Sequence, residues 1–201
     1  MINNLMNSIE FCKCVEPKKR TVLPYVYSED AKKMKNQFLI MVKPECLAIE
    51  KGVNSKAILT HFRERAEIFD IHINSISAMN GLYLKERHMM EHQYQMLNKG
   101  AKFGIRHLPI NVQEELQSKY RGYTILGAYE FLLKHNEISA CMLERESHIK
   151  GSEKLGNGCY LFLFEYNGIE YGIVNAFHPN QLEHFYDSQN TILVINCSSE
   201  T

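Results

Sequence analysis

The first strong hydrophobic pattern in the chain is the apolar run FLIMV at residues 38–42, which ends at Lys43 and a proline. Strand-forming residues stopped by proline are typical of a strand buried on both faces. Residues 54–66 then carry a possible Asn or Ser cap followed by apolar positions at helical spacing, which predicts a helix. Isoleucines return at residues 68–76 and predict a second strand. The opening pattern is therefore β-α-β.

The middle of the chain carries weaker patterns. Residues 84–97 have long, mostly unbranched side chains without Gly or Pro, which favours a helix, and NKGAKFG at 98–104 indicates a turn. Two further helices are predicted, at 111–120 and 123–136. Within the second of these, the stretch TILGAYEF also fits a strand, and periodicity leaves both readings open.

The last third gives the clearest β signal. The segment 146–158 is polar and rich in glycine, which predicts a loop. CYLFLFEY and IEYGIVNAF then flank Asn167-Gly168, a dipeptide that supplies the positive φ angles of a two-residue hairpin turn. His178 and the following proline stop the second strand. A short helix and a final strand, TILVIN, complete the predicted order of elements.

Composition indicates an ordinary globular protein of 201 residues, 45% hydrophobic and 23% charged. We expect one domain over residues 37–201, preceded by an N-terminal arm at 1–36. The basic cluster at 18–20 and the polar run at 28–36 are expected to be solvated parts of this arm. Lys+Arg and Asp+Glu balance at 23 each, which excludes the global positive field of a protein that binds nucleic acid mainly by charge.

The six cysteines are spread along the chain, and Cys12 and Cys14 are the only close pair. This pattern lacks the paired knuckles of a zinc ribbon and the density of a disulfide framework, so we expect reduced thiols. The first residues carry no basic region followed by a long apolar stretch, so we expect no secretory leader, and no run of about 18 apolar residues occurs in the sequence. A cytoplasmic protein without a membrane span is the expectation.

Two residues with side chains capable of chemistry, Lys43 and His178, directly follow predicted strands that end abruptly. Open α/β sheets present such strand ends to ligands. Taken alone, Lys43 can be a lysine that reaches solvent, and His178 a histidine that shapes a turn.

Together, these segments resemble nucleoside diphosphate kinases. FLIMVKPE at 38–45 is similar to the family's first strand and M-V-K-P-D, and residues 175–178, NAFH, are similar to its N-x-x-H. Gln93-Tyr94 resembles the family's H-Y. The likeness covers about 38–104 and 172–187, and the middle region at about 105–170 is rewritten.

The resemblance implies an α/β (α+β) fold with a ferredoxin-like antiparallel sheet and packed helices. It implies a phosphotransferase in which His178 takes the γ-phosphate of ATP or another nucleoside triphosphate, with Mg²⁺ carried by the phosphates and no metal ligands on the protein. Lys43 would hold phosphates, Tyr94 and Asn175 would position the histidine and the nucleotide, and Phe103 would stack on a base. Arg145 or Arg121 would neutralise phosphate charge. The implied partners are a nucleotide and, as in the family, further copies of the chain, without nucleic acid or membrane.

The sequence also departs from the family. Pro179-Asn180-Gln181 replaces the family's G-S-D after the histidine, and Gln189 stands where the family has the glutamate that holds the imidazole. Glu183 or Asp187 can substitute for that glutamate. Two alternatives therefore stay open beside phosphotransfer: a nucleotide hydrolase or nucleotidyl transferase that uses the same pocket, and a non-catalytic nucleotide-binding regulatory module.

Overall fold

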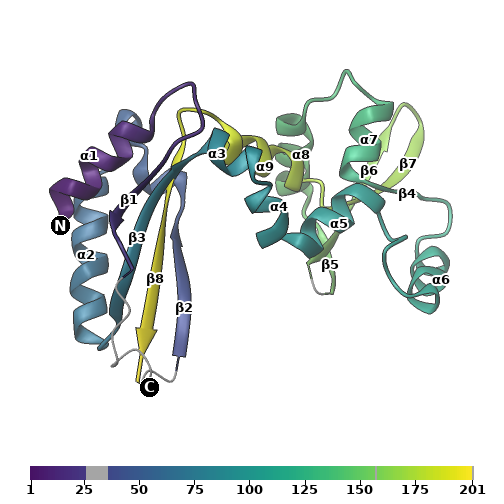
Figure 1. The fold of residues 1–201 in the computed structure, drawn as a ribbon. Helices are drawn as coiled ribbons and strands as arrows, with labels where there is room; N and C mark the ends of the chain where they lie inside the picture. The colour runs from purple at the N-terminus through teal and green to yellow at the C-terminus, as the bar shows by residue number, and fades with distance from the viewer. Residues whose placement is uncertain (26–35, 157, 201) are drawn as a thin grey trace. The chain divides into compact units, whose positions relative to one another are not determined.

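A computed structural model describes residues 1–25, 36–156 and 158–200. The chain forms two compact units (Figure 1). The first unit contains Met1–His88 and His184–Thr201, and the second unit contains Met89–Glu183. The second unit is thus inserted in the sequence of the first, and the single sheet expected over residues 37–201 is replaced by one four-stranded sheet in each unit. The broader prediction, a mixed α/β protein with antiparallel sheets, is confirmed.

The first unit is a sheet with helices on one face. Its strands lie in the order β1-β3-β8-β2, and all neighbours are antiparallel. Helices α1 and α2 lie side by side on one face of this sheet (Figure 1). The main elements are α1 (Ile2–Cys12), β1 (Lys19–Leu23), β2 (Asn36–Val42), α2 (Ser55–Ile68), β3 (His72–Asn80), α3 (Gly81–Glu86) and β8 (Thr191–Ser199), with short 3-10 turns at Pro44–Leu47 and Ile49–Lys51.

The predicted β-α-β opening is present as β2, α2 and β3. Helix α2 begins where the sequence predicts, because Oδ1 of Asn54 accepts a hydrogen bond from the N–H of Ala57 at 3.0 Å. Strand β8 lies between β2 and β3, so the two strands are parallel to each other without being paired. The prediction that the first strand is buried on both faces is wrong, because β2 is an edge strand and Leu39 is 66% exposed.

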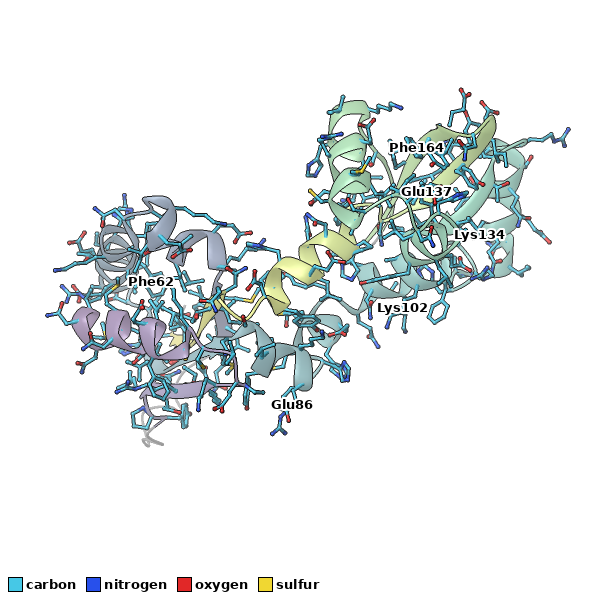
Figure 2. All side chains as sticks on the ribbon, turned by 90° about the horizontal axis from the view of Figure 1, so that it is seen from above. Phe62, Glu86, Lys102, Lys134, Glu137 and Phe164 are labelled. Carbon is cyan, nitrogen blue, oxygen red and sulfur yellow. The ribbon has the colours of Figure 1, made fainter. Side chains whose placement is uncertain are left out.

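In the described residues 1–25, the predicted N-terminal arm is instead an integral part of the first unit. Helix α1 buries Leu5, Ile9 and Cys12 against the sheet, and Phe62 of α2 packs against the same core (Figure 2). Strand β1, which contains two residues of the basic cluster, pairs with β3. An amphipathic helix in contact with a sheet buries its apolar stripe, which explains why these residues are ordered. The polar run at 28–35 lies outside the described residues.

The second unit has a different sheet, with strand order β4-β7-β6-β5. Strands β4 and β7 are parallel, and the other neighbours are antiparallel. Phe131 and Phe162 are fully buried in its main core, and Phe164 packs against them (Figure 2). Its elements are α4 (Met89–Gln93), α5 (Gln95–Phe103), α6 (Ile110–Lys119), β4 (Thr124–Gly127), α7 (Ala128–Lys134), α8 (Ala140–Lys150), β5 (Glu153–Gly156), β6 (Cys159–Tyr166), β7 (Ile169–Val174) and α9 (His178–Tyr186), the last of which continues into the first unit.

Several predictions for the middle of the chain need correction. The single helix expected at 84–97 is broken into α3, α4 and α5, with His88 at a positive φ of 51° between the first two. The expected turn at 98–104 is mostly helical, because α5 continues to Phe103. The expected loop at 146–158 contains the end of α8 and strand β5 in its described part. TILGAYEF contains both a strand and a helix, because β4 ends at Gly127 and α7 begins at the next residue.

The predicted hairpin, the short helix after it and the final strand are confirmed. Strands β6 and β7 form an antiparallel hairpin in which Tyr166 pairs with Ile169. Asn167 and Gly168 have φ angles of 51° and 74°, the signs that the predicted turn requires. All six cysteines are free thiols, as expected. Among the described residues, no helix is both long enough and apolar enough to span a membrane.

Candidate functional site

His178 is the first residue of helix α9 in the second unit. The backbone N–H of His178 donates to the carbonyl of Asn175 at 3.0 Å, so N-A-F-H forms a tight turn between β7 and α9. Asn175 has a φ of 56°, in the left-handed region that asparagine tolerates better than most residues. The chain therefore reverses sharply at the end of a strand and delivers an imidazole at a helix N-terminus.

Asn175 fixes this turn to the surrounding backbone. Its side chain is fully buried, and Oδ1 accepts from the N–H of Tyr160 at 3.0 Å. Nδ2 donates to the carbonyls of Leu97 and Gly158 at 2.8 and 2.9 Å. These three bonds join α5, the start of β6 and the end of β7. Asn175 thus positions His178, and its amide is occupied by backbone groups.

The His178 side chain lies in an apolar, enclosed environment. The residue is 3% exposed, and Nε2 is buried without a hydrogen-bond partner among the described residues. The ring of Tyr129 meets the imidazole edge to face, with centroids 6.3 Å apart. Burial lowers the pKa of His178 to about 4, because the charged form loses its hydration. The imidazole is therefore neutral near pH 7.

Two charged groups of the same unit act on this ring with opposite sign. Glu91 on α4 raises the pKa of His178 and Lys102 on α5 lowers it, both by less than burial does (Figure 2 labels Lys102). Burial also raises the pKa of Tyr129 to about 12, with smaller contributions from Glu91 and Glu183. Tyr129 therefore stays a phenol, a neutral group that can donate a hydrogen bond.

The first turn of α9 is held by α8. Asn180 Nδ2 donates to a carboxylate oxygen of Glu144, and Gln181 Nε2 donates to the other oxygen at 3.4 Å. Asn180 and Gln181 thus bind a neighbouring helix. Their position keeps the N-terminus of α9, and with it His178, in a defined place.

Lys43 is exposed and directly follows β2 in the first unit, where it precedes the 3-10 turn at Pro44–Leu47. His178 belongs to the second unit. The predicted meeting of Lys43 and His178 around a phosphate therefore stays a prediction.

The other residues predicted for the site are distributed over the second unit. Tyr94 is half-buried between α4 and α5, where its backbone N–H donates to Met90 at 2.9 Å. Phe103 ends α5 and is 49% exposed. Arg121 is exposed in the turn after α6. Arg145 is exposed on α8, where its guanidinium lies 3.8 Å from a carboxylate oxygen of Glu146.

Glu183 and Asp187, the two acidic residues predicted to hold the imidazole of His178, belong to different units. Glu183 lies on α9 in the second unit and acts electrostatically on Tyr129, the ring that meets His178. Asp187 belongs to the first unit, where its carboxylate accepts the N–H of Gln189 at 2.8 Å. Glu183 is therefore the candidate in the same unit as the imidazole.

Sequence reasoning missed Tyr129 and Glu91. Tyr129 lies in the segment whose secondary structure was left open, and only its resolution into β4 and α7 directs the ring toward His178. Glu91 sits on a five-residue helix that sequence patterns merged into a longer one. No motif marks Tyr129, and the H-x-x-E-H spacing that contains Glu91 points to a metal pair and not to His178.

The resemblance to nucleoside diphosphate kinases depends on short sequence motifs alone. No protein-family model, no curated protein and no solved structure matches the chain. Within the described part of the chain, no group of three His, Cys, Asp or Glu side chains is arranged to hold a metal ion. What the site offers chemically is a neutral, positioned imidazole with a phenol and opposite charges nearby, a set suited to nucleophilic or acid-base chemistry.

Proposed function

We propose that the protein is a nucleotide-dependent phosphotransferase that acts through a phosphohistidine at His178. The observation that carries this proposal is the state of the imidazole: it is neutral, fixed at a helix N-terminus, and its buried Nε2 has no hydrogen-bond partner among the described residues. A neutral imidazole has the lone pair that a nucleophile needs. The acceptor of the phosphoryl group would be a nucleotide or a phosphorylated metabolite.

In this reaction, Nε2 attacks the γ-phosphorus of a nucleoside triphosphate. The P–N bond forms as the bond from phosphorus to the bridging oxygen breaks, and the nucleoside diphosphate leaves with that oxygen. The N-terminus of α9 carries a partial positive charge that favours a phosphoryl group at its first residue. Because Nε2 is buried, the nucleotide must open the environment of His178 before transfer.

Further groups would neutralise and orient the phosphates. Mg²⁺ would arrive bound to the nucleotide, and the resemblance to nucleoside diphosphate kinases assigns Lys43 to the β- and γ-phosphates. Arg145 lies one residue from Glu144, the side chain that binds the first turn of α9, which supports it over Arg121 as the second cation. The family relationship is supported in the first unit by β2 and β3 flanking β8 with α2 as their connection, an arrangement compatible with a ferredoxin-like sheet.

The test is incubation of the protein with γ-labelled ATP and Mg²⁺, followed by detection of label on the protein. We expect acid-labile, alkali-stable label on the natural protein and none on His178→Ala. His148→Ala is the matched control, because His148 is exposed on α8 and has no role in the proposal. Equal labelling of the natural protein and His178→Ala, or no label on either, contradicts the covalent mechanism.

A non-catalytic nucleotide-binding module is the second candidate. The specific observation in its favour is the 3% exposure of His178, together with the use of Asn180 and Gln181 to bind Glu144. ATP binding without label or turnover would support this module. Turnover that depends on His178 without labelled protein would support hydrolysis, or nucleotidyl transfer if pyrophosphate is released.

A further inference from the structure

A second pair of reactive side chains lies in the second unit, Cys159 at the start of β6 and His107 after α5. Nε2 of His107 is 3.5 Å from Sγ of Cys159, and Nδ1 is 2.8 Å from the carbonyl oxygen of Gly104. A carbonyl only accepts hydrogen bonds, so Nδ1 carries the proton and Nε2 presents its lone pair to the thiol. A nucleophile, a base and a group that orients the base are thus aligned.

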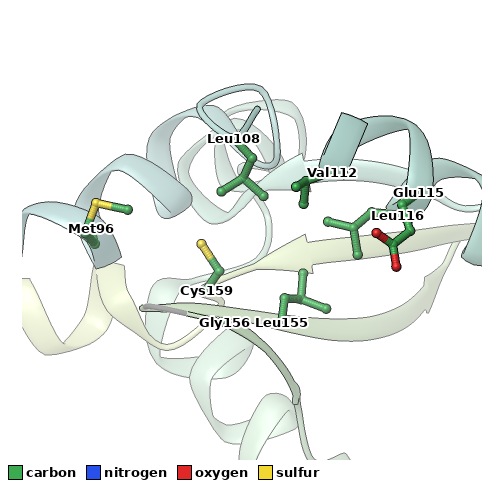
Figure 3. A pocket seen from close by; sticks show the side chains of 8 residues that line it. All are labelled: Met96, Leu108, Val112, Glu115, Leu116, Leu155, Gly156 and Cys159. Carbon is green, nitrogen blue, oxygen red and sulfur yellow. The ribbon is translucent and has the colours of Figure 1, made fainter. Parts of the chain in front are cut away.

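Cys159 lines a cavity of about 300 Å³ (Figure 3). This volume is at the lower end of the range for small-molecule sites. Figure 3 shows the sulfur of Cys159 directed into the space between Met96, Leu108 and Val112. Leu116 and Leu155 add to the apolar lining, and Glu115 is its charged member. The cavity therefore suits a short apolar chain with its reactive group at the sulfur.

Burial determines how such a thiol reacts. Cys159 is 3% exposed, and desolvation raises the pKa of its thiol. The resting Cys159 is therefore a protonated thiol beside the ring of His107, without a preformed thiolate. A neutral electrophile that excludes water can still react, because His107 can take the proton as the sulfur attacks.

We propose that Cys159 and His107 form a nucleophilic thiol site that accepts a short apolar acyl group from an acyl thioester. Sγ of Cys159 attacks the carbonyl carbon while Nε2 of His107 takes the thiol proton. The carbon–sulfur bond of the donor then breaks, and the leaving thiolate takes the proton from Nε2. The products are S-acylated Cys159 and one free thiol, without oxidation or reduction.

The test uses the full-length protein and the hexanoyl thioester of N-acetylcysteamine, with intact mass and peptide mapping as readouts. We expect one added hexanoyl group, located on Cys159 and absent from Cys159→Ser. Cys141→Ser is the matched control, because Cys141 is the exposed cysteine of the same unit. In this variant, Cys159 should be acylated at the same rate as in the natural protein. Acylation of Cys141 or Cys46 in preference to Cys159 overturns the proposal.

Two further variants separate the site from general thiol reactivity. His107→Gln should slow acylation of Cys159 by about 100-fold, a typical contribution of a general base. Val112→Phe fills the cavity and should slow the hexanoyl donor more than the matching acetyl donor. An unchanged rate in His107→Gln, or equal slowing of both donors in Val112→Phe, overturns the proposal. Circular dichroism of each variant at the assay temperature confirms that the readout comes from folded protein.

Discussion

The backbone of Gly100 in α5 lies directly against the side-chain amide of Asn175, and a Cβ atom at position 100 would lie 2.5 Å from Nδ2 of Asn175. A glycine inside a helix costs stability, and here it permits the close approach of α5 to the turn that carries His178. The N-A-F-H turn therefore depends on the absence of a side chain at a residue 75 positions earlier in the sequence.

Replacement of Asn175 should weaken the second unit. Asn175→Ala removes three side-chain hydrogen bonds to backbone groups and leaves those groups without their partner. We expect a loss of about 3 kcal/mol in the free energy of unfolding, measured with urea. Lys134→Ala, at an exposed position of α7, is the control and should change it by less than about 0.5 kcal/mol. Equal stability of Asn175→Ala and the control would contradict the role of Asn175.

Stability should fall in mild acid because of His178. The folded pKa is about 4 and the ordinary value is 6.5, so between these values the unfolded chain binds a proton that the folded protein does not. The contribution of neutral His178 to the free energy of unfolding is fully present above pH 6.5, and it is lost as the pH falls toward 4. The full loss amounts to about 3 kcal/mol. Urea unfolding at pH 7.5 and pH 5 measures the fall.

His178→Gln is the variant that isolates this effect, because glutamine does not titrate. Its stability should depend less steeply on pH between 7.5 and 5 than that of the natural protein. The other histidines are common to both proteins and cancel in the comparison. Parallel pH profiles for the two proteins would show that His178 is accessible to protons in the folded state.

Substitutions in the hairpin turn should affect stability according to how well the new residue tolerates a positive φ. Gly168 has a φ of 74°, and a Cβ atom there would meet no atom within 4 Å, so any penalty comes from the backbone alone. Gly168→Val should cost about 1–2 kcal/mol, since β-branched residues avoid positive φ. Asn167→Gly should change the free energy of unfolding by less than about 0.5 kcal/mol. A harmless Gly168→Val would mean that another turn geometry is adopted.

The two candidate arginines should differ under the proposed phosphotransfer. Arg145 is on α8, the helix whose Glu144 binds the start of α9, whereas Arg121 follows α6. Arg145→Ala should lower the rate of His178 labelling by about tenfold, the value of one charge-assisted hydrogen bond. Arg121→Ala should leave the rate unchanged. The reverse order would move the phosphate toward the turn after α6.

Local patterns predicted the elements whose signals are contained in a few residues. The Asn54 cap, the strand at 38–42, the Asn167-Gly168 turn and the final strand each depend on the conformational preferences of nearby residues, and each is present. The breaks at 84–97 and the helix through Gly100 escaped prediction. Their conformations are determined by contacts with distant segments, such as that between Gly100 and Asn175.

The sequence by itself determined the β-α-β opening, the hairpin at Asn167-Gly168 and the final strand, the free cysteines expected from their spacing, and the strand end at Lys43. Only the tertiary structure decided that the chain forms two units with separate sheets and that residues 2–12 belong to a core. It also decided that Tyr129 lies beside His178 and that His107 lies beside Cys159. The physical reason is that helix and turn preferences act over a few residues. Burial, which sets the neutral state of His178 and of the Cys159 thiol, depends on atoms far apart in the chain.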